Sequence, residues 1–573
     1  MRQVSAPETS LTLEAPATLD GSDKNHGKAK ASPPNGVDKR QSPSDLQRRY
    51  DPSQEAGKQV WWQRDVNRPF GKPKLARQVT LQSLIVMARA QSPRVKSISQ
   101  QGLIQETAIT EALAQFDVRA FAESRFRQNS DPVGNTLVTG GPLRFRETDY
   151  TYSAGYRKKI SLGGTIELAQ RMGVRSNNSR FFIPTIQGNS QLTLSFTQPI
   201  LNGAGQAYNN SLTILAQIDT EIAWKKMSGD LQTYLTQISE AYWELYLHRA
   251  TLLQKQRNLD RAVVIVKQLQ ARQSLDASRR QVLPAQAAVA ERQSQLVRAE
   301  AMVKNVEARL RSMVALSGFE ELVPADLPSA SPVNVSMKEA LVTAMVHRPE
   351  VDQAMKQVKA ASVRLAMSQN ELLPVFDLVL ESYVAGLAGQ GRAGQALLRQ
   401  FDTGQPSYTA GFVFEVPLGN RAAKARLNRR KLELQQLTSD MDDTMKAFSA
   451  EVEVAVREVN TAFRELQARS RSMAFAKSDA QSIHERWKTM VEGRSATLLL
   501  EDLLDAQERL ATQERTYANA QRAYSVSLIA VQKVMGTLLQ HRQIHHRKVE
   551  DCESPSVHFE VLEQTGLGHP GAQ

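Results

Sequence analysis

The chain has 573 residues and a net charge of +13, and only 6% of its residues are aromatic. A low aromatic share favours long helices over compact β or α/β cores. The single cysteine, Cys552, excludes an internal disulfide and a multi-cysteine zinc site.

The basic charge is spread among Glu and Gln residues, as on solvated helix faces, and does not by itself indicate nucleic-acid binding. No stretch of sequence approaches the roughly 18 apolar residues of a membrane-spanning helix. If the protein crosses a membrane, we expect a β-barrel, which also satisfies its own backbone hydrogen bonds. The first residues do not read as a signal peptide, and the short apolar segment 84–90, which imitates part of one, is expected to be structural.

Both ends of the chain are polar. Residues 1–75 are rich in Ser, Pro, Asp, Lys and Gly and are expected to form a disordered N-terminal extension. Trp61 and Trp62 are the exception, and we expect them to fix this segment to the body of the protein. Residues 541–573 are predicted to form a loose polar tail.

Between these ends the sequence repeats itself, with a first half at 76–334 and a second half at 335–540. The segments 79–93 and 335–349 share their apolar rhythm, and each ends in proline, at Pro93 and Pro349. Each half is predicted to contain a helix, strands and a long helical hairpin.

Strict alternation of apolar and polar residues predicts strands at 191–199 and 408–417, and aromatic stretches at 116–126 and 373–383 indicate strand partners. A strand between lipid and a wet lumen needs this pattern, but a soluble sheet shows it too. Each strand leads into an Asn/Gly corner, at 202–205 and 419–420.

Two very long helices are predicted after these corners, because 206–275 and 421–490 contain no proline. About 70 residues at about 1.5 Å each span about 105 Å, far more than a globular-domain helix. The next helix of each half carries apolar residues spaced by seven, which indicates a coiled-coil seam. The two series are Val282, Val289, Leu296, Val303, Leu310 and Leu503, Leu510, Tyr517, Tyr524, Val531.

Short motifs at matching places in the two halves resemble those of the TolC-like outer-membrane efflux proteins, the outer membrane factors. The resemblance covers roughly residues 75–540. It rests on Arg348-Pro349-Glu350, Leu373-Pro374, Val416-Pro417-Leu418-Gly419-Asn420, Arg486-Trp487, Gly493, Leu503-Leu504-Asp505-Ala506-Gln507 and Met535-Gly536.

The resemblance implies a mainly α-helical membrane protein with two tandem repeats. Long antiparallel coiled-coil helices would form an α-barrel, and four β-strands per protomer would complete a 12-stranded barrel in a homotrimer. It implies a passive export duct in the cell outer membrane, in contact with outer-membrane lipid and extending into the periplasm. A periplasmic adaptor protein and an inner-membrane transporter would be its partners. No enzymatic activity, cofactor, metal or nucleic acid is expected.

The resemblance also places a gate at the tips of the hairpins, where Asp502 and Asp505 would form an acidic ring at the periplasmic entrance. Arg494 is a candidate partner for this ring, with Asp276, Arg279 and Arg280 near the other tip. Alternatively, the two acids are ordinary first-turn residues favoured by the helix dipole. Gly493 marks the tip, and twelve residues separate it from Asp505, where about nine are usual, so the tip is expected to carry an extra turn.

Several other signals are weaker. Gly389–Gly394 fits G-x-G-x-x-G, but it stands between two strands and is expected to be a connecting loop. His541, His545 and His546 lack further ligands at site-like spacing. Two alternatives to a channel remain: a structural coiled-coil envelope protein, which would contain no strands, and a basic scaffold that binds nucleic acid.

Overall fold

The computed structural model describes residues 60–71, 76–272, 279–489, 494–542, 544–550 and 555–561. The chain divides after Pro52 into two units, and every described residue belongs to the second, Ser53–Gln573. Among the described helices, none is both long enough and apolar enough to cross a membrane.

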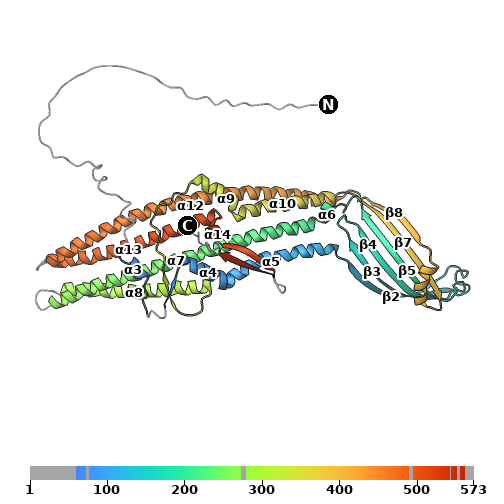
Figure 1. Ribbon diagram of the computed structural model, residues 1–573, viewed down its shortest axis with the longest axis horizontal. Coiled ribbons are helices and arrows are strands. Elements are labelled where there is room, and N and C mark those ends of the chain that lie inside the picture. The colour runs from blue at the N-terminus through green and yellow to red at the C-terminus, as the bar shows by residue number, and fades with distance from the viewer. Residues whose placement is uncertain are drawn as a thin grey trace, which may run out of the picture. The chain divides into compact units, whose positions relative to one another are not determined.

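Four long helices form two antiparallel hairpins (Figure 1). The first hairpin pairs α7 (Ser211–Arg272) with α8 (Arg279–Val314), and the second pairs α12 (Arg421–Thr489) with α13 (Arg494–Val534). The long helices predicted after the two Asn/Gly corners are therefore confirmed. Both corners use left-handed backbone, with φ values of 92° at Gly205 and 92° at Gly419, a conformation that glycine adopts without strain.

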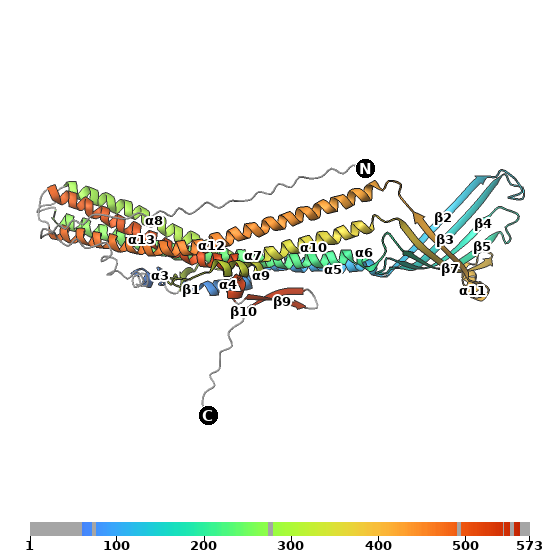
Figure 2. The same cartoon turned by 90° about the horizontal axis from the view of Figure 1, so that it is seen from above.

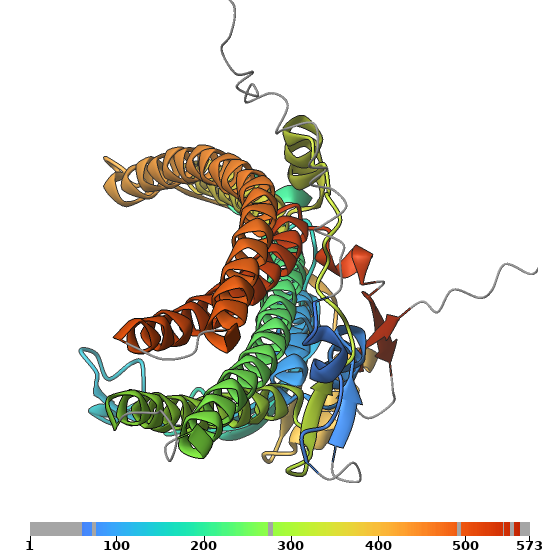
Figure 3. The same cartoon turned by 90° about the vertical axis from the view of Figure 1, so that its left-hand side faces the viewer.

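The four helices lie side by side in a curved wall, in the order α8, α7, α13, α12 (Figure 3). Small elements pack on its convex side. They include α3 (Gln63–Val66), α4 (Leu81–Gln91) and a parallel strand pair, β1 (Ala76–Val79) with β6 (Glu321–Pro324). The main apolar core lies between these elements and the wall.

A shorter pair of helices precedes the strands in each half. In the first half α4 is followed by α5 (Pro93–Leu113), and in the second α9 (Met337–His347) is followed by α10 (Pro349–Asn370). Each second helix begins with proline, which fits the first turn of a helix but cannot continue the one before it. The repeated proline of the sequence therefore marks the same bend twice.

One large antiparallel sheet lies at the ends of α5, α7, α10 and α12 (Figure 2). Its order is β2 (Arg119–Pro132), β3 (Arg144–Lys159), β4 (Thr165–Asn177), β5 (Ile186–Pro199), β7 (Val375–Gly389) and β8 (Ser407–Glu415). The fold class is confirmed with one correction, because the sheet has six strands where four were predicted. The first half contributes an extra hairpin, β3–β4, whose tight turn contains Gly163 at φ 96°.

The strand register gives this sheet two different faces. Directly paired residues are either both even-numbered or both odd-numbered along all five strand pairs, as in Gln170 opposite Leu192. The even-numbered residues therefore share one face of the sheet, called the even face, and the odd-numbered residues share the other, called the odd face. The even face carries most of the large apolar side chains, including Tyr150, Tyr152, Tyr156, Leu168, Leu192, Leu194, Phe196, Phe376, Leu380, Phe412 and Phe414. The odd face carries most of the charges, including Glu123, Arg125, Glu147, Asp149, Arg157, Glu167, Arg171, Arg175, Asp377 and Glu381.

Other parts of the described chain form smaller elements. A short helix, α11 (Ala393–Asp402), connects β7 to β8, so the G-x-G-x-x-G segment is a connection, as predicted. Beyond α14 (Leu538–His541), β9 (Ile544–Glu550) and β10 (Pro555–Val561) form an antiparallel hairpin. The prediction of a loose tail from residue 541 is wrong for these residues, because apolar alternation at 557, 559 and 561 supports a strand.

Candidate functional site

The tip of the second hairpin carries the predicted gate residues on α13. Asp502 and Asp505 are both exposed, and neither forms an ion pair with any side chain that the structure describes. Asp505, Thr512 and Asn519 are spaced by seven residues, so in a coiled coil they lie on the same face of α13. Asp502 and Thr516 are fourteen residues apart, which is two heptads, so they also share a face of α13.

The remaining predicted tip residues lie at or beyond the described ends of the helices. Asp276 and Gly493 are outside the described residues. Arg279 and Arg280 begin α8 and Arg494 begins α13, but their side chains are also outside the described part. Pairing between Arg494 and the two aspartates therefore stays a prediction.

An apolar cluster just behind the tips joins the two hairpins. Leu503 is fully buried in it and packs with Ile265 of α7 and Trp487 of α12. The other members are Leu269, Val282, Ala285, Leu499, Leu500 and Leu504. The sequence predicted a coiled-coil seam through Val282 and Leu503, and this cluster confirms that both residues are interior positions.

A polar layer follows this cluster along the seam between the hairpins, centred on the buried Arg292 of α8. Its guanidinium donates hydrogen bonds of 3.0 Å to the carbonyl of Asn258, 3.0 Å to Oε1 of Gln507 and 3.2 Å to the carbonyl of Leu504. Burial lowers the pKa of Arg292, although the nearby Glu508 opposes this effect. One arginine thus links three of the four long helices.

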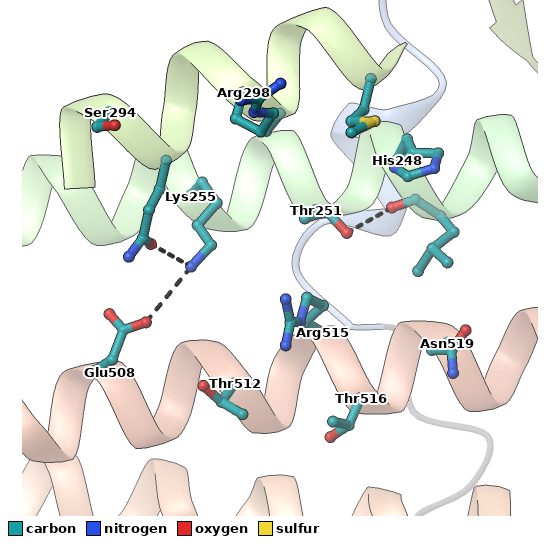
Figure 4. A pocket seen from close by; sticks show the side chains of 14 residues that line it. His248, Thr251, Lys255, Ser294, Arg298, Glu508, Thr512, Arg515, Thr516 and Asn519 are labelled. Atoms are coloured by element: carbon teal, nitrogen blue, oxygen red, sulfur yellow. Dashed lines mark hydrogen bonds and ion pairs between the residues drawn. The ribbon is translucent and has the colours of Figure 1, made fainter. Parts of the chain in front are cut away.

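Beyond Arg292 the seam widens into a groove of about 750 Å³ between α8, α7 and α13 (Figure 4). Lys255 crosses its end, where Nζ donates to Oε1 of Gln295 at 2.5 Å and lies 3.5 Å from Oε1 of Glu508. Further along, Arg298 and Arg515 line the groove. Neither forms an ion pair with a described side chain.

The charge of this groove is positive. Its lining contains three cationic side chains, Lys255, Arg298 and Arg515, and one carboxylate, Glu508. His248 also lines it, and burial lowers the pKa of this imidazole, so it adds no charge at neutral pH. The remaining lining side chains are polar or apolar without charge: Leu247, Thr251, Ser294, Gln295, Ala299, Met302, Thr512, Thr516 and Asn519.

The groove lies on the concave side of the helical wall, because the convex side of the α7–α13 seam is covered by the N-terminal segment, which Figure 4 shows behind α7. There Nε1 of Trp61 donates to Oε1 of Glu514 at 2.9 Å, and the Arg257 guanidinium lies 4.3 Å from the centre of the Trp61 ring. Trp62 is fully buried beside Tyr517. The prediction that the two tryptophans fix this segment to the body is confirmed.

Another arginine, which the sequence analysis did not single out, also binds the N-terminal segment. Arg249 of α7 is fully buried and donates to the carbonyls of Val66 at 3.1 Å and Arg68 at 2.6 Å, and to Oε1 of Glu321 at 2.7 Å. Glu321 also accepts the backbone N–H of Phe70 at 2.9 Å. In the sequence, an isolated arginine within the apolar run 241–253 was the signal that could have pointed to it.

Comparison with known proteins gives the fold a name. No family model matches the sequence, and no curated protein matches it either. Solved structures do match. The VceC outer-membrane protein of Vibrio cholerae is 16% identical, with a TM-score of 0.57 over 80% of this chain and 96% of that one.

Two further channels have the same fold. The CmeC outer-membrane channel of Campylobacter jejuni is 12% identical, with a TM-score of 0.58 over 84% of this chain and 91% of that one. The open-state MtrE outer-membrane channel of Neisseria gonorrhoeae is 15% identical, with a TM-score of 0.58 over 80% and 89%. The chain has the TolC-like fold of outer-membrane channels. Within the TolC-like fold, the groove and the aspartates lie on the helical wall, and the two-faced sheet lies at the other end of the long helices.

Proposed function

We propose that this chain is one protomer of a passive homotrimeric duct that exports solutes across the outer membrane. The observation that carries the proposal is the two-faced sheet at the end of a long, curved helical wall. An apolar face with aromatic side chains suits lipid, and a charged face suits a water-filled lumen. Five of the six strands have 13 to 16 residues, longer than the roughly 9–11 residues needed to cross a bilayer.

Aromatic residues on the even face gather at two places along the strands. Towards the helical end, the Phe376 ring stacks on Phe412 at 5.4 Å. Near the middle of β2 and β3, Tyr150 lies 4.7 Å from Tyr152 and 6.0 Å from Phe126. Both clusters support a lipid-facing surface, and the ring pair at the helical end stands where an aromatic girdle is expected at a membrane interface.

The assembly would be completed by pairing β2 of one protomer with β8 of the next, because these strands form the two edges of the sheet. Three sheets of six strands would give eighteen strands, where the family resemblance implied twelve. Barrel diameter grows roughly linearly with strand number, so this barrel would be about 1.5 times as wide as a 12-stranded one. Trimer formation is testable by cross-linking and mass determination in detergent.

We further propose that the helical tips meet a periplasmic adaptor and that an inner-membrane transporter supplies the energy. Asp502 and Asp505 would form a ring that narrows the periplasmic entrance. Their position in the heptad register of the groove residues Thr512 and Thr516 supports this proposal. A ring of carboxylates attracts cations and repels anions at a constriction.

The experiment is conductance across a planar bilayer, comparing the natural protein with Asp502→Ala plus Asp505→Ala. We expect small, cation-selective channels that conduct more in the double variant. The matched control is Asp440→Ala plus Asp443→Ala, because these exposed aspartates are also three residues apart but lie in the first third of α12, far from the tip.

The outcomes separate the parts of the proposal. Channels that are unaltered by the tip variants leave the duct in place and reject the acidic gate. Absence of channels from a folded trimer rejects the duct. A purely structural coiled-coil protein, the main alternative, would contain no strands, and the six-stranded sheet argues against it.

A further inference from the structure

The connection between β7 and β8 forms a helix, α11, that lies against the sheet near the loop ends of the strands (Figure 2). A Cβ atom added to Gly386 would stand 2.1 Å from the carbonyl oxygen of Ala396. One added to Gly188 would stand 2.6 Å from the backbone nitrogen of Ala393. Both glycines are even-numbered strand residues, so α11 covers the apolar face of the sheet and not the charged face.

The polar side of α11 faces the sheet. Gln400 is fully buried, and its Nε2 donates to Oε1 of Gln170 at 3.0 Å. Its Oε1 accepts a hydrogen bond of 3.0 Å from Oγ of Ser190. Because these contacts satisfy the buried amide, they fix the rotation of the helix about its own axis.

The side of α11 that faces away from the sheet carries two large apolar side chains beside the exposed Gln395 and Asp402. Leu398 and Phe401, three residues apart on one face of the helix, have exposed fractions of 71% and 66%. On a helix that packs against a sheet in water, large apolar residues usually face the sheet and glutamine faces the solvent. In α11, Leu398 and Phe401 are exposed and Gln400 is buried, and a lipid surrounding favours this arrangement.

Cationic side chains flank this apolar face. Arg392 at the start of α11 and Arg399 within it are both exposed, and Arg399 donates to the carbonyl of Leu387 at 3.2 Å. Basic side chains next to an apolar helical face are typical of helices that lie at the surface of a membrane with anionic lipids.

We propose that α11 is a lipid anchor on the outer surface of the sheet. Leu398 and Phe401 enter the acyl-chain region, and Arg392 and Arg399 contact anionic headgroups at the loop end of the strands. The proposal rests on the proposed function, since it requires the sheet to span a membrane. It excludes a role for α11 as a plug, because the lumen would be lined by the opposite, charged face.

The test is the depth of spin labels in vesicles of phosphatidylcholine and phosphatidylglycerol. The chain has one cysteine, so Cys552→Ser provides a clean background for single labels at Leu398→Cys and Phe401→Cys. Two strand positions on β8 are controls: Phe412→Cys on the even face and Thr409→Cys on the odd face. All four side chains are exposed in the protomer, so labelling does not disturb its core.

We expect the labels at 398 and 401 to behave like the label at 412, with a several-fold higher ratio of oxygen to nickel-complex accessibility than the label at 409. If the label at 412 is in lipid and those at 398 and 401 are in water, the anchor is rejected and the membrane-spanning sheet remains. If the label at 412 is also in water, the proposed function fails, and the anchor fails with it.

Discussion

The indole nitrogen of Trp61 donates a 2.9 Å hydrogen bond to the carboxylate of Glu514, which lies 453 residues further along the chain. This bond fixes the segment before the first repeat to the last long helix. Because α7 also contacts the segment through Arg249 and Arg257, the N-terminal residues brace the seam between the two hairpins on its convex side.

The first prediction concerns the bracing by Trp62. Trp62→Ala removes a fully buried indole from its contact with Tyr517 and is expected to cost about 3–5 kcal/mol of unfolding free energy. The measurement is denaturant unfolding of the protein in detergent, followed by circular dichroism. Phe319→Ala is the control, because Phe319 is 98% exposed and its loss should change stability by less than about 0.5 kcal/mol. Equal losses for the two variants would show that the N-terminal segment does not brace the seam.

The second prediction concerns the ionisation of Glu514. Burial raises the pKa of this carboxyl, and the Trp61 hydrogen bond and the charges of Arg261 and Arg257 offset the effect only in part. A raised pKa in the folded state means that folding favours the protonated form, so this residue's contribution to stability increases as pH falls through its folded pKa. Glu514→Gln imitates the protonated form.

We therefore expect Glu514→Gln to be at least as stable as the natural protein at pH 7, and the difference to shrink as pH falls towards the ordinary glutamate pKa. Thermal unfolding midpoints at several pH values measure the difference. A gap that grows on acidification would contradict the raised pKa. Glu465→Gln is the control, since Glu465 is an exposed α12 residue paired with Arg469 at 3.3 Å.

The third prediction concerns Arg249, whose guanidinium is buried among the carbonyls of Val66 and Arg68 and the carboxylate of Glu321. Removing one partner of a buried ion pair leaves the other uncompensated, so Arg249→Met is expected to cost about 3–5 kcal/mol. Arg309→Met is the matched control. Arg309 pairs with Glu244 at 3.2 Å but is exposed, and such pairs contribute about 0–1 kcal/mol. Similar losses in the two variants would reject the role assigned to Arg249.

The sequence predicted the helical part of this fold well and the sheet only in part. Proline at equivalent bends, heptads in α8 and α13 and the Asn/Gly corners are local signals, and the structure places each where it was expected. The hairpin β3–β4 was missed because Arg144–Lys159 mixes tyrosines with charges, so a search for alternating apolar and polar residues does not single it out as a strand.

The sites were less accessible to sequence reasoning, because they depend on which helices become neighbours. Arg292 and Lys255 are unremarkable in a basic chain until α13 supplies Gln507 and Glu508 beside them. The exposed Leu398 and Phe401 of α11 also suggest a contact with lipid only once the sheet register shows that the helix covers the even face. The gate role of Asp502 and Asp505 came from a family resemblance and stays a prediction that awaits a functional test.

The last prediction concerns ion selectivity in the groove on the concave face. If this face lines the duct, Arg298 and Arg515 raise the local concentration of anions, since a unit charge at about 4 Å is worth about 1 kcal/mol in water. Arg298→Gln plus Arg515→Gln should shift the reversal potential in a potassium chloride gradient towards cation selectivity, with the anion-to-cation permeability ratio falling on the order of twofold.

Lys304→Gln is the control, because Lys304 is exposed on α8 but does not line the groove. An equal shift in the control would mean that overall charge, and not the groove, sets the selectivity. No shift in the double variant would place the groove outside the conducting path.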